Sequence, residues 1–501
     1  MRDSLKVWFL ASEVVPFAKT GGLADVAGSL PASLKDLGVD VSVGLPFYRM
    51  TKNGNYKTEE VLNGLEVPLG EAKRRGEVLK TSTQDGIPVY LFRQEDFFDR
   101  SGLYGTAQGD YPDNFERFTY FSRAALLFAK ETGLRFDVVH CHDWQTGLIP
   151  AYLKTLYRTD PFFSDAASVI TVHNLGYQGV FPAEKLPTSG LPASEFRPEG
   201  VEYWGKISLL KAGIVYSDAI TTVSPRYSQE IQTPEFGLGM EGIFQKRSAD
   251  LYGILNGADY DTWDPAIDPH IKAGYTFSDT KNKKECKVDL VNELGLDRRF
   301  VDRPVLGMIS RLAAQKGCDL LVQIAQDIVQ LDAGLVILGA GEETYQKFLV
   351  KLGREYPDSM AVRIGFDETL AHRIMAGADM LLVPSRYEPC GLTQIYALRY
   401  GTVPIVRATG GLDDTIEQFA PGSGQGTGFK FVDYEAKAFL EKIQEAVSLF
   451  EDNTTWMRLV TNGMKCDFSW ERSAREYVSL YEKVKQAIKN KSEVRNDRRR
   501  E

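Results

Sequence analysis

Short apolar strands alternate with longer helical segments through almost the whole chain, and this alternation limits the possible folds more than any other feature. In the first half we predict helices at 23–37 and 115–132 and strands at 6–11, 39–45, 89–93, 136–140 and 167–173. The strands are nearly continuous apolar runs, as in sheets that are covered on both faces. Strands that alternate with helices predict right-handed crossovers and parallel sheets.

A second series of the same kind begins near residue 304. It has a predicted helix at 317–331 and predicted strands at 304–310, 334–341, 380–385 and 403–406. Residues 259–286 lack clear periodicity and are rich in Asp, Pro and Lys, so we interpret them as a connection. The sequence therefore predicts an α/β protein with two doubly wound, Rossmann-like domains, 1–254 and 255–469. Residues 490–501 are charged, lack apolar spacing, and predict a frayed tail.

Composition excludes several classes of protein. The chain has 501 residues, of which 43% are hydrophobic and 25% charged, as in ordinary globular proteins. Its net charge of −9 is unfavourable for a general nucleic-acid binder, and no apolar run approaches the length of a membrane span. The N-terminal apolar run is too short for a signal peptide. Five scattered cysteines without a CxxC pair are typical of a reducing compartment, so we expect a cytoplasmic protein with no nucleic-acid or membrane partner.

Two loops resemble each other and suggest a phosphate-bearing ligand. Each half opens with a strand, then a loop with a basic residue, then a helix that starts at glycine: Lys19 with Gly21 and Gly22 in the first half, Arg311 and Lys316 in the second. Ligands of open α/β sheets bind beyond the carboxyl ends of the strands, where helix N-termini favour anions. The residues alone leave the alternative of plain turns with solvated charges open.

Further candidates lie at other predicted strand ends. His140 and His142 alternate along one strand, but no Cys or His pair at zinc spacing lies nearby, so we expect no metal. Asp143 is better placed to bind a polar ligand, whereas His173 is as readily structural. Glu388 follows a strand and precedes a glycine turn, a geometry suited to binding sugar hydroxyls. The Cys390 thiol has no obvious histidine partner, which favours packing over nucleophilic catalysis.

No motif for a cofactor is complete. Gly339-Ala340-Gly341 follows a strand, but residue 344 is Thr where the dinucleotide fingerprint needs Gly. A P-loop and a nucleophile elbow are also missing from the sequence, so we expect no cofactor.

Seven short segments, in this order, resemble the bacterial glycogen synthases and plant starch synthases, the retaining glycosyltransferases of family 5. They are KTGGL (19–23), HDWQTG (142–147), TVHN (171–174), LNGADYD (255–261), SRLAAQKG (310–317), EPCGLT (388–393) and TGGLDD (409–414). The resemblance covers about residues 5–485.

The resemblance implies a fold of the GT-B type, in which two Rossmann-like domains face a deep cleft and a helix at about 470–489 packs back on the first domain. It also implies a hexosyltransferase that moves glucose from ADP-glucose to the non-reducing end of an α-1,4-glucan, glycogen or a malto-oligosaccharide, with retention of configuration. Neither a metal nor a cofactor is implied.

It also implies roles for single residues. In the second domain, Arg311 and Lys316 correspond to the pair that stabilises the leaving diphosphate, Glu388 to the acid beneath the donor sugar, and Thr393 to a diphosphate contact. Cys390 and Gly391 complete that substrate-binding segment. Phe366 stands where the family often has a tyrosine that stacks on adenine, so stacking is kept and a hydroxyl is lost.

Further implied roles fall on residues of the first domain and on Asn256, just past the predicted end of that domain at residue 254. Lys19, beside Gly21 and Gly22, matches a contact to the donor phosphate, and Asp25 a nearby acid. His173 matches a residue near the reacting carbon, and Asp143 and Asn256 match side chains that position the glucose. The alternatives are a transferase of the same fold that uses UDP-glucose and a catalytically silent glucan-binding protein.

Overall fold

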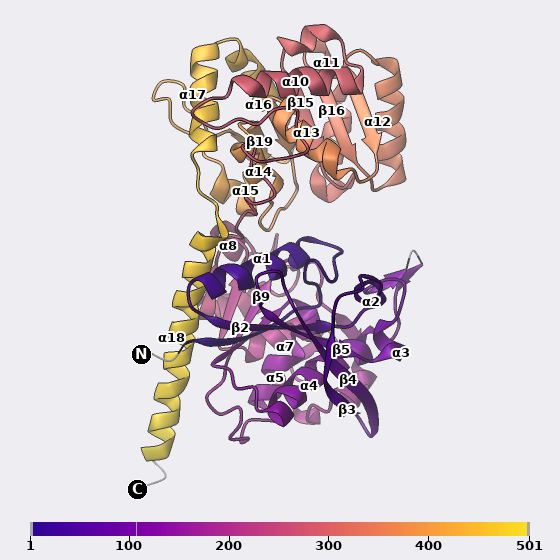
Figure 1. Cartoon of the computed structure of the whole chain (residues 1–501), viewed down its shortest axis with the longest axis vertical. Helices are drawn as coiled ribbons and strands as arrows, with labels where there is room; N and C mark the ends of the chain where they lie inside the picture. The colour runs from indigo at the N-terminus through magenta and orange to yellow at the C-terminus, as the bar shows by residue number, and fades with distance from the viewer. Residues whose placement is uncertain (1–3, 107, 498–501) are drawn as a thin grey trace. The chain divides into compact units, whose positions relative to one another are not determined.

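A computed structural model describes residues 4–106 and 108–497, which form two compact units (Figure 1). Unit 1 comprises the chain up to Val223, Ser228–Gly257, and the chain from Trp470. Unit 2 comprises Ser224–Tyr227 and Ala258–Ser469. The chain thus leaves unit 1 after Gly257, near the predicted division between residues 254 and 255, and returns at Trp470.

The core of unit 1 is a nine-stranded sheet of order β14-β13-β9-β8-β1-β2-β5-β4-β3. Its strands are β1 (Lys6–Leu10), β2 (Asp40–Pro46), β3 (Glu59–Leu69), β4 (Ala72–Ser82), β5 (Pro88–Arg93), β8 (Val138–His142), β9 (Ala167–Val172), β13 (Ala219–Thr222) and β14 (Leu251–Gly253). From β14 to β5 all neighbours are parallel. Val7 to Leu10 are all buried, which explains why β1 is apolar without alternation.

Helices cover this sheet. The longer ones are α1 (Gly22–Asp36), α4 (Asn114–Thr132), α5 (Leu148–Lys154), α7 (Leu209–Tyr216) and α18 (Trp470–Asp497). The shorter ones are α2 (Arg49–Asn53), α3 (Glu95–Phe98), α6 (Leu186–Ser189) and α9 (Glu241–Lys246), while α8 (Pro225–Glu230) spans residues of both units. A small antiparallel sheet contains β10 (Val180–Pro182), β11 (Glu202–Tyr203) and β12 (Lys206–Ser208).

Unit 2 holds a six-stranded sheet of order β17-β16-β15-β18-β19-β20, parallel throughout. Its strands are β15 (Val305–Ile309), β16 (Gly334–Gly339), β17 (Met360–Ile364), β18 (Met380–Val383), β19 (Val403–Arg407) and β20 (Phe429–Phe431). Its helices are α10 (Lys281–Leu294), α11 (Cys318–Gln330), α12 (Glu343–Glu355), α13 (Glu368–Gly377), α14 (Thr393–Arg399), α15 (Gly410–Thr415), α16 (Ala436–Phe450) and α17 (Asn453–Met464).

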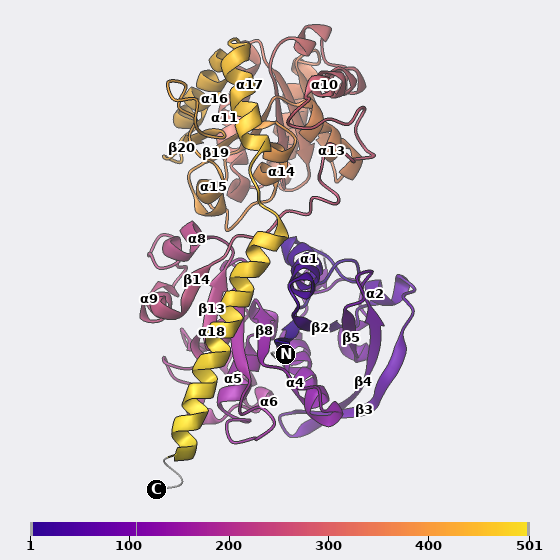
Figure 2. The ribbon, with the colours of Figure 1, turned by 60° about the vertical axis from the view of Figure 1, so that its left-hand side comes forward.

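The C-terminal helix α18 belongs to unit 1, where it packs against α1 and β9 (Figures 1 and 2). The expectation of a frayed tail from residue 490 is wrong as far as Asp497, because the helix continues to that residue. Lys, Glu and Arg are strong helix formers, so a charged segment can prolong a docked helix. Residues 498–501 lie outside the described part of the chain.

The predicted fold class is confirmed: both units are α/β with doubly wound parallel sheets. The sequence reading missed the hairpin β3–β4, which adds two antiparallel strands at one edge of the first sheet. It also extended the connection too far, since α10 already begins at Lys281. No helix within the described residues combines the length and apolar character that a membrane span requires.

Candidate active site

The carboxyl ends of β15, β18 and β19 bring most of the predicted residues of unit 2 together. These strands are adjacent and parallel, so the loops that follow them meet at one edge of the sheet. The loop after β15 carries Arg311 and Lys316, and the loop after β18 carries Glu388.

Lys316 and Glu388 form an ion pair, with 2.6 Å between Lys316 Nζ and Glu388 Oε2. Ser385 Oγ donates a second hydrogen bond of 2.9 Å to the same carboxylate oxygen. The Lys316 side chain is 21% exposed and the Glu388 side chain 10%. A charge-assisted pair so poorly hydrated fixes both side chains and leaves the lysine accessible on one side.

Glycines allow these loops to approach each other closely. A Cβ on Gly317, which has a φ of +77°, would lie 2.1 Å from the carbonyl oxygen of Pro384. A Cβ on Gly410 would lie 2.0 Å from the carbonyl oxygen of Glu388. The backbone N–H of Gly411 donates to that same oxygen at 3.1 Å. The loop that carries Glu388 is therefore fixed by backbone contacts that no larger residue would permit.

The other predicted residues of unit 2 lie along the same edge. Arg311 is exposed, and its Nη2 donates to the Gln315 side chain at 3.0 Å. Phe366 follows β17 and is 92% exposed. Cys390 is buried, Gly391 has a φ of +73°, and Thr393 is the first residue of α14.

In unit 1, Glu13 holds the loop that contains Lys19. Its carboxylate accepts hydrogen bonds from the backbone of Thr20, from Thr20 Oγ1 at 2.6 Å and from the N–H of Gly21 at 3.0 Å. Lys19 Nζ lies 2.6 Å from Asp25 Oδ1 in the first turn of α1, and both side chains are exposed. Glu13 thus fixes the backbone of this loop, while the side chain of Lys19 remains exposed to solvent.

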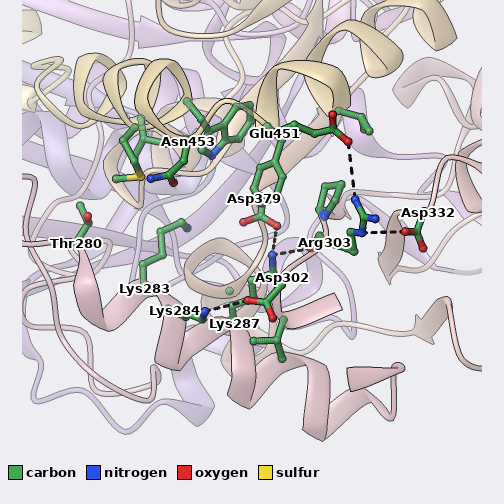
Figure 3. Close-up of a pocket in the computed structure, with 18 of the residues that line it drawn as sticks. Thr280, Lys283, Lys284, Lys287, Asp302, Arg303, Asp332, Asp379, Glu451 and Asn453 are labelled. Atoms are coloured by element: carbon green, nitrogen blue, oxygen red, sulfur yellow. Dashed lines mark hydrogen bonds and ion pairs between the residues drawn. The ribbon is translucent and has the colours of Figure 1, made fainter. Parts of the chain in front are cut away.

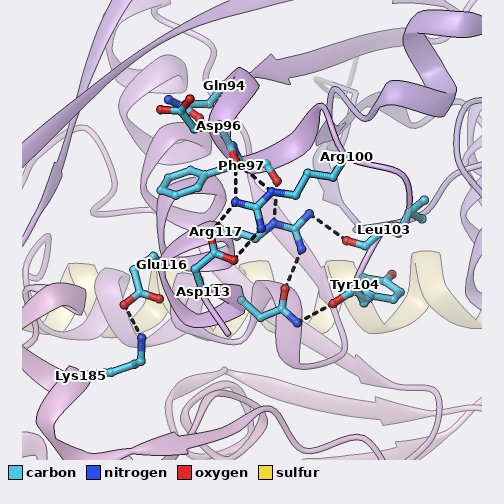
Figure 4. A network of polar contacts seen from close by, with 11 residues as sticks. Gln94, Asp96, Phe97, Arg100, Leu103, Tyr104, Asp113, Glu116, Arg117 and Lys185 are labelled. Carbon is cyan, nitrogen blue, oxygen red and sulfur yellow. Dashed lines mark hydrogen bonds and ion pairs between the residues drawn. The ribbon is translucent and has the colours of Figure 1, made fainter. Parts of the chain in front are cut away.

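A network of polar contacts around Tyr104 and Arg117, drawn in Figure 4, supports Glu13 in turn through the Tyr104 hydroxyl. Tyr104 donates from its hydroxyl to Glu13 Oε1 at 2.6 Å. The carbonyl of Tyr104 accepts from Asn114 Nδ2 at 2.8 Å, and Asn114 Oδ1 accepts from Arg117 Nη1 at 2.6 Å. Arg117 also donates to the carbonyls of Phe97 and Leu103, so the N-terminus of α4 fixes the segment that carries Tyr104.

Asp143 and His173 lie together at the ends of β8 and β9. The N–H of His173 donates to Asp143 Oδ1 at 2.8 Å, and Asp143 has a φ of +54°. Burial raises the pKa of Asp143 to about 7 and lowers the pKa of His173 to about 3. His173 is consequently a neutral imidazole at physiological pH, and its Nε2 is 2.9 Å from His142 Nδ1.

The remaining predicted residue of unit 1 is Asn256, which is buried. Its Oδ1 has no hydrogen-bond partner among the side chains and backbone groups that the structure describes. A buried acceptor without a partner is costly and is consistent with a ligand contact.

Sequence reasoning missed Glu13, Tyr104 and Ser385. Glu13 left a signal in the sequence, because it is a carboxylate two residues after a predicted apolar strand and six residues before Lys19. The structure shows that Glu13 is buried, which is unusual for this residue type. Tyr104 left none, since only the folded chain brings it to Glu13. Ser385 lies three residues before Glu388 in the same loop, so its proximity to Glu388 was visible in the sequence. His140 and His142 do share one side of β8, as predicted, with 4.1 Å between ring centroids. Within the described residues, no three His, Cys, Asp or Glu side chains form a metal-binding group.

A cavity of about 610 Å³ opens at the opposite, amino ends of β15 and β18 in unit 2 (Figure 3). Lys287 and Asp379 form a buried ion pair of 2.7 Å in its wall. Arg303 lies 3.0 Å from Asp332, and Lys284 lies 2.9 Å from Asp302. Its charges neutralise one another, and none of the predicted site residues lines it.

Two Rossmann-like units whose strand ends carry basic residues, a carboxylate and glycine turns are suited to a phosphate-bearing ligand, and comparison with known proteins assigns them to the glycosyltransferases. Residues 6–246 match the family model described as the starch synthase catalytic domain, and residues 297–462 match that of the glycosyl transferases group 1. The chain is 49% identical over 482 residues to the glycogen synthase of Koribacter versatilis (strain Ellin345), covering 96% of this chain and 99% of that protein. It is 47% identical over 480 residues to the glycogen synthase of Syntrophotalea carbinolica (strain DSM 2380 / NBRC 103641 / GraBd1), covering 96% and 99%.

A solved structure, the catalytic domain of starch synthase IV from Arabidopsis thaliana bound to ADP and acarbose, superimposes with a TM-score of 0.88 and 34% identity, covering 96% of this chain and 100% of that one. Sucrose-phosphate synthase from Thermosynechococcus elongatus, with a TM-score of 0.59 and 18% identity, shares the fold alone. The chain therefore belongs to the glycogen and starch synthase family and is a glucosyltransferase of that family.

Proposed function

We propose that the sugar donor is ADP-glucose and that the acceptor is the non-reducing end of an α-1,4-glucan. The ADP in the starch synthase IV structure supports an adenine nucleotide. Phe366 supports it as well, because an aromatic ring that is 92% exposed at the edge of the sheet offers a face on which a base can stack. All five cysteines are free thiols, which supports a cytoplasmic location.

The observation that carries this proposal is the ion pair between Lys316 and Glu388. It places a cation and a carboxylate 2.6 Å apart at one strand edge, with Arg311 in the loop that leads to Lys316. We assign Arg311 and Lys316 to the diphosphate, where negative charge grows as the glycosidic bond breaks. We assign Glu388 to the hydroxyls of the sugar, and Cys390, Gly391 and Thr393 to the backbone and hydroxyl contacts beside it.

In unit 1 we assign Lys19, with Gly21, Gly22 and Asp25, to the nucleotide-sugar. The assignment rests on the way Glu13 holds this loop, which keeps the backbone N–H groups fixed and the lysine exposed. His173, Asp143 and Asn256 are assigned to the glucose. His173, which burial keeps neutral, and Asp143, whose pKa burial raises, offer hydrogen bonds to sugar hydroxyls.

The proposed reaction is a front-face substitution. The acceptor 4-hydroxyl forms a bond to the anomeric carbon on the side from which the diphosphate leaves, and the departing phosphate takes the hydroxyl proton. This route retains the configuration and needs no covalent intermediate on the protein.

Labelled ADP-glucose and UDP-glucose compared on glycogen test the proposal, with the linkage and anomeric configuration of the product determined. We expect incorporation from ADP-glucose as new α-1,4-linked ends. Preferential use of UDP-glucose would assign the other donor, and failure with both would indicate a silent glucan-binding protein.

A further inference from the structure

Two neighbouring turns of unit 1 place hydrophobic residues in a backbone conformation that such residues avoid. Trp204 and Gly205 connect β11 to β12 as a two-residue hairpin turn, with φ values of +51° and +75°. Leu238 and Gly239 have φ values of +49° and +84°. Asn and Asp are the usual residues before glycine in turns with two positive φ values, and a bulky side chain there is strained.

Both hydrophobic side chains of these turns are exposed. Trp204 is 80% exposed and Leu238 is 49% exposed, so neither is placed there to fill the core. The indole Nε1 of Trp204 has no hydrogen-bond partner within the described part of the chain. A bulky residue that is held at a positive φ and gains no buried contacts indicates a functional role for its side chain.

The two turns form one surface. Tyr203 donates from its hydroxyl to the carbonyl of Leu238 at 2.8 Å, and its ring lies 6.4 Å from that of Trp204 at an angle of 74°. A Cβ on Gly239 would lie 3.5 Å from Trp204 Nε1, so the indole lies beside the second turn. We call Tyr203, Trp204 and Leu238 the aromatic platform.

The platform is linked to the loop that follows His173. Gln178 Nε2 donates to the same carbonyl of Leu238 at 3.1 Å, and the carbonyl of Gln178 accepts from Ser208 Oγ at 2.9 Å. Tyr177, next to Gln178, is 59% exposed. The residues from His173 to the platform are thus one connected strip of unit 1.

We propose that the aromatic platform binds α-glucan, with the indole of Trp204 stacked on the apolar face of a glucose ring. Pyranose rings present C–H groups on their faces and hydroxyls on their rims, which matches an exposed indole that offers an apolar face and an N–H donor at its edge. A glucan is the occupant because the family extends this polymer, and the platform is continuous with the loop of His173. The inference rests on the proposed acceptor and adds a binding surface for it.

The test measures binding of maltoheptaose, without any sugar donor, to the full-length protein and to three variants. Trp204→Asn supplies the residue that the turn prefers and removes the ring, so we expect an unchanged or higher melting temperature and a Kd raised about tenfold. Trp204→Tyr keeps an aromatic face and should restore most of the affinity. Phe348→Asn, at an exposed aromatic residue of α12 in unit 2, is the matched control and should leave the Kd unchanged.

A wild-type Kd in Trp204→Asn would overturn the inference. A change in sedimentation coefficient without a change in Kd would also overturn it, because the platform would then be a contact between copies of the chain. Loss of affinity in Trp204→Tyr equal to that in Trp204→Asn would overturn the stacking role. Failure of wild-type protein to use ADP-glucose would count against the proposed donor alone, since maltoheptaose binding is measured without it.

Discussion

Replacement of Lys316 by alanine separates the energetic role of its ion pair from its proposed catalytic role. The Lys316 side chain lies 2.6 Å from Glu388 and is 21% exposed. Removal of one partner from a fully buried ion pair costs about 3–5 kcal/mol of folding free energy. Because Lys316 is partly hydrated and Ser385 still donates to Glu388, we expect Lys316→Ala to cost only about 1–2 kcal/mol, which lowers the melting temperature by about 2–8 °C.

The expected loss of turnover is larger. A charge-assisted contact to a leaving diphosphate is stronger in the transition state than in the ground state. Removal of one such contact costs about 2.7–4 kcal/mol of barrier, or roughly a hundred- to a thousandfold in kcat. Lys316→Ala should therefore impair catalysis far more than folding.

Arg311→Ala is the matched control for stability. Arg311 is exposed, and among the described residues its guanidinium hydrogen-bonds to the Gln315 side chain alone, so we expect an unchanged melting temperature with a similar loss of kcat. The measurements are the release of ADP at saturating sugar donor and the thermal unfolding of each variant. If either variant kept more than about a third of wild-type turnover, a loss below about 1 kcal/mol, the assignment to the diphosphate would be refuted.

Three further outcomes are expected. Activity should survive EDTA, because arginine and lysine neutralise the diphosphate; complete loss restored by Mg²⁺ or Mn²⁺ would contradict this. Burial raises the pKa of Asp143 to about 7, so its protonated form contributes stability that is complete below the unfolded pKa of about 4 and is lost as pH rises towards 7. Relative to Asp143→Asn, the wild type should thus lose on the order of 1 kcal/mol per pH unit between pH 5 and 6.5 in urea unfolding, and parallel pH profiles would exclude this. Glu13→Gln should raise the KM for the sugar donor because the loop of Lys19 loses a charged acceptor; an unchanged KM would show that the loop is fixed without it.

Glu388→Gln distinguishes two roles for the carboxylate. An acid that merely complements a helix dipole contributes about 0.3–1 kcal/mol of stability and would leave an active enzyme. The structure instead pairs Glu388 with Lys316 and Ser385, so we expect a modest loss of stability and a heavy loss of turnover. Near-wild-type kinetics of Glu388→Gln would show that the role of this carboxylate is structural.

Periodicity was sufficient to predict the parallel core, because strands such as β1 and β9 are buried on both faces and are therefore mostly apolar, without alternation. The hairpin β3–β4 has a different pattern, in which buried and exposed residues alternate. Leu65, Val67 and Leu69 are buried while Glu66 is exposed, an alternation typical of a sheet with one solvated face. That alternation was visible in the sequence. The start of α10 at Lys281 could not be recognised, because the first turn of this helix is polar.

The candidate site was predictable where residues lie close together in the sequence. Arg311 and Lys316 share one loop, and the glycines beside Lys19 and Glu388 mark their turns. The contacts between distant segments were not predictable: Tyr104 to Glu13, and Lys316 to Glu388. Such contacts depend on the order of strands in the sheet, which no local pattern encodes.

Transfer of labelled glucose from ADP-glucose to the non-reducing ends of glycogen tests the central claim most directly. The account predicts that ADP-glucose is used in strong preference to UDP-glucose, that the new linkages are α-1,4, and that Arg311→Ala and Lys316→Ala abolish most of this transfer while the protein stays folded. Equal or better transfer from UDP-glucose, or wild-type transfer by both variants, would contradict it.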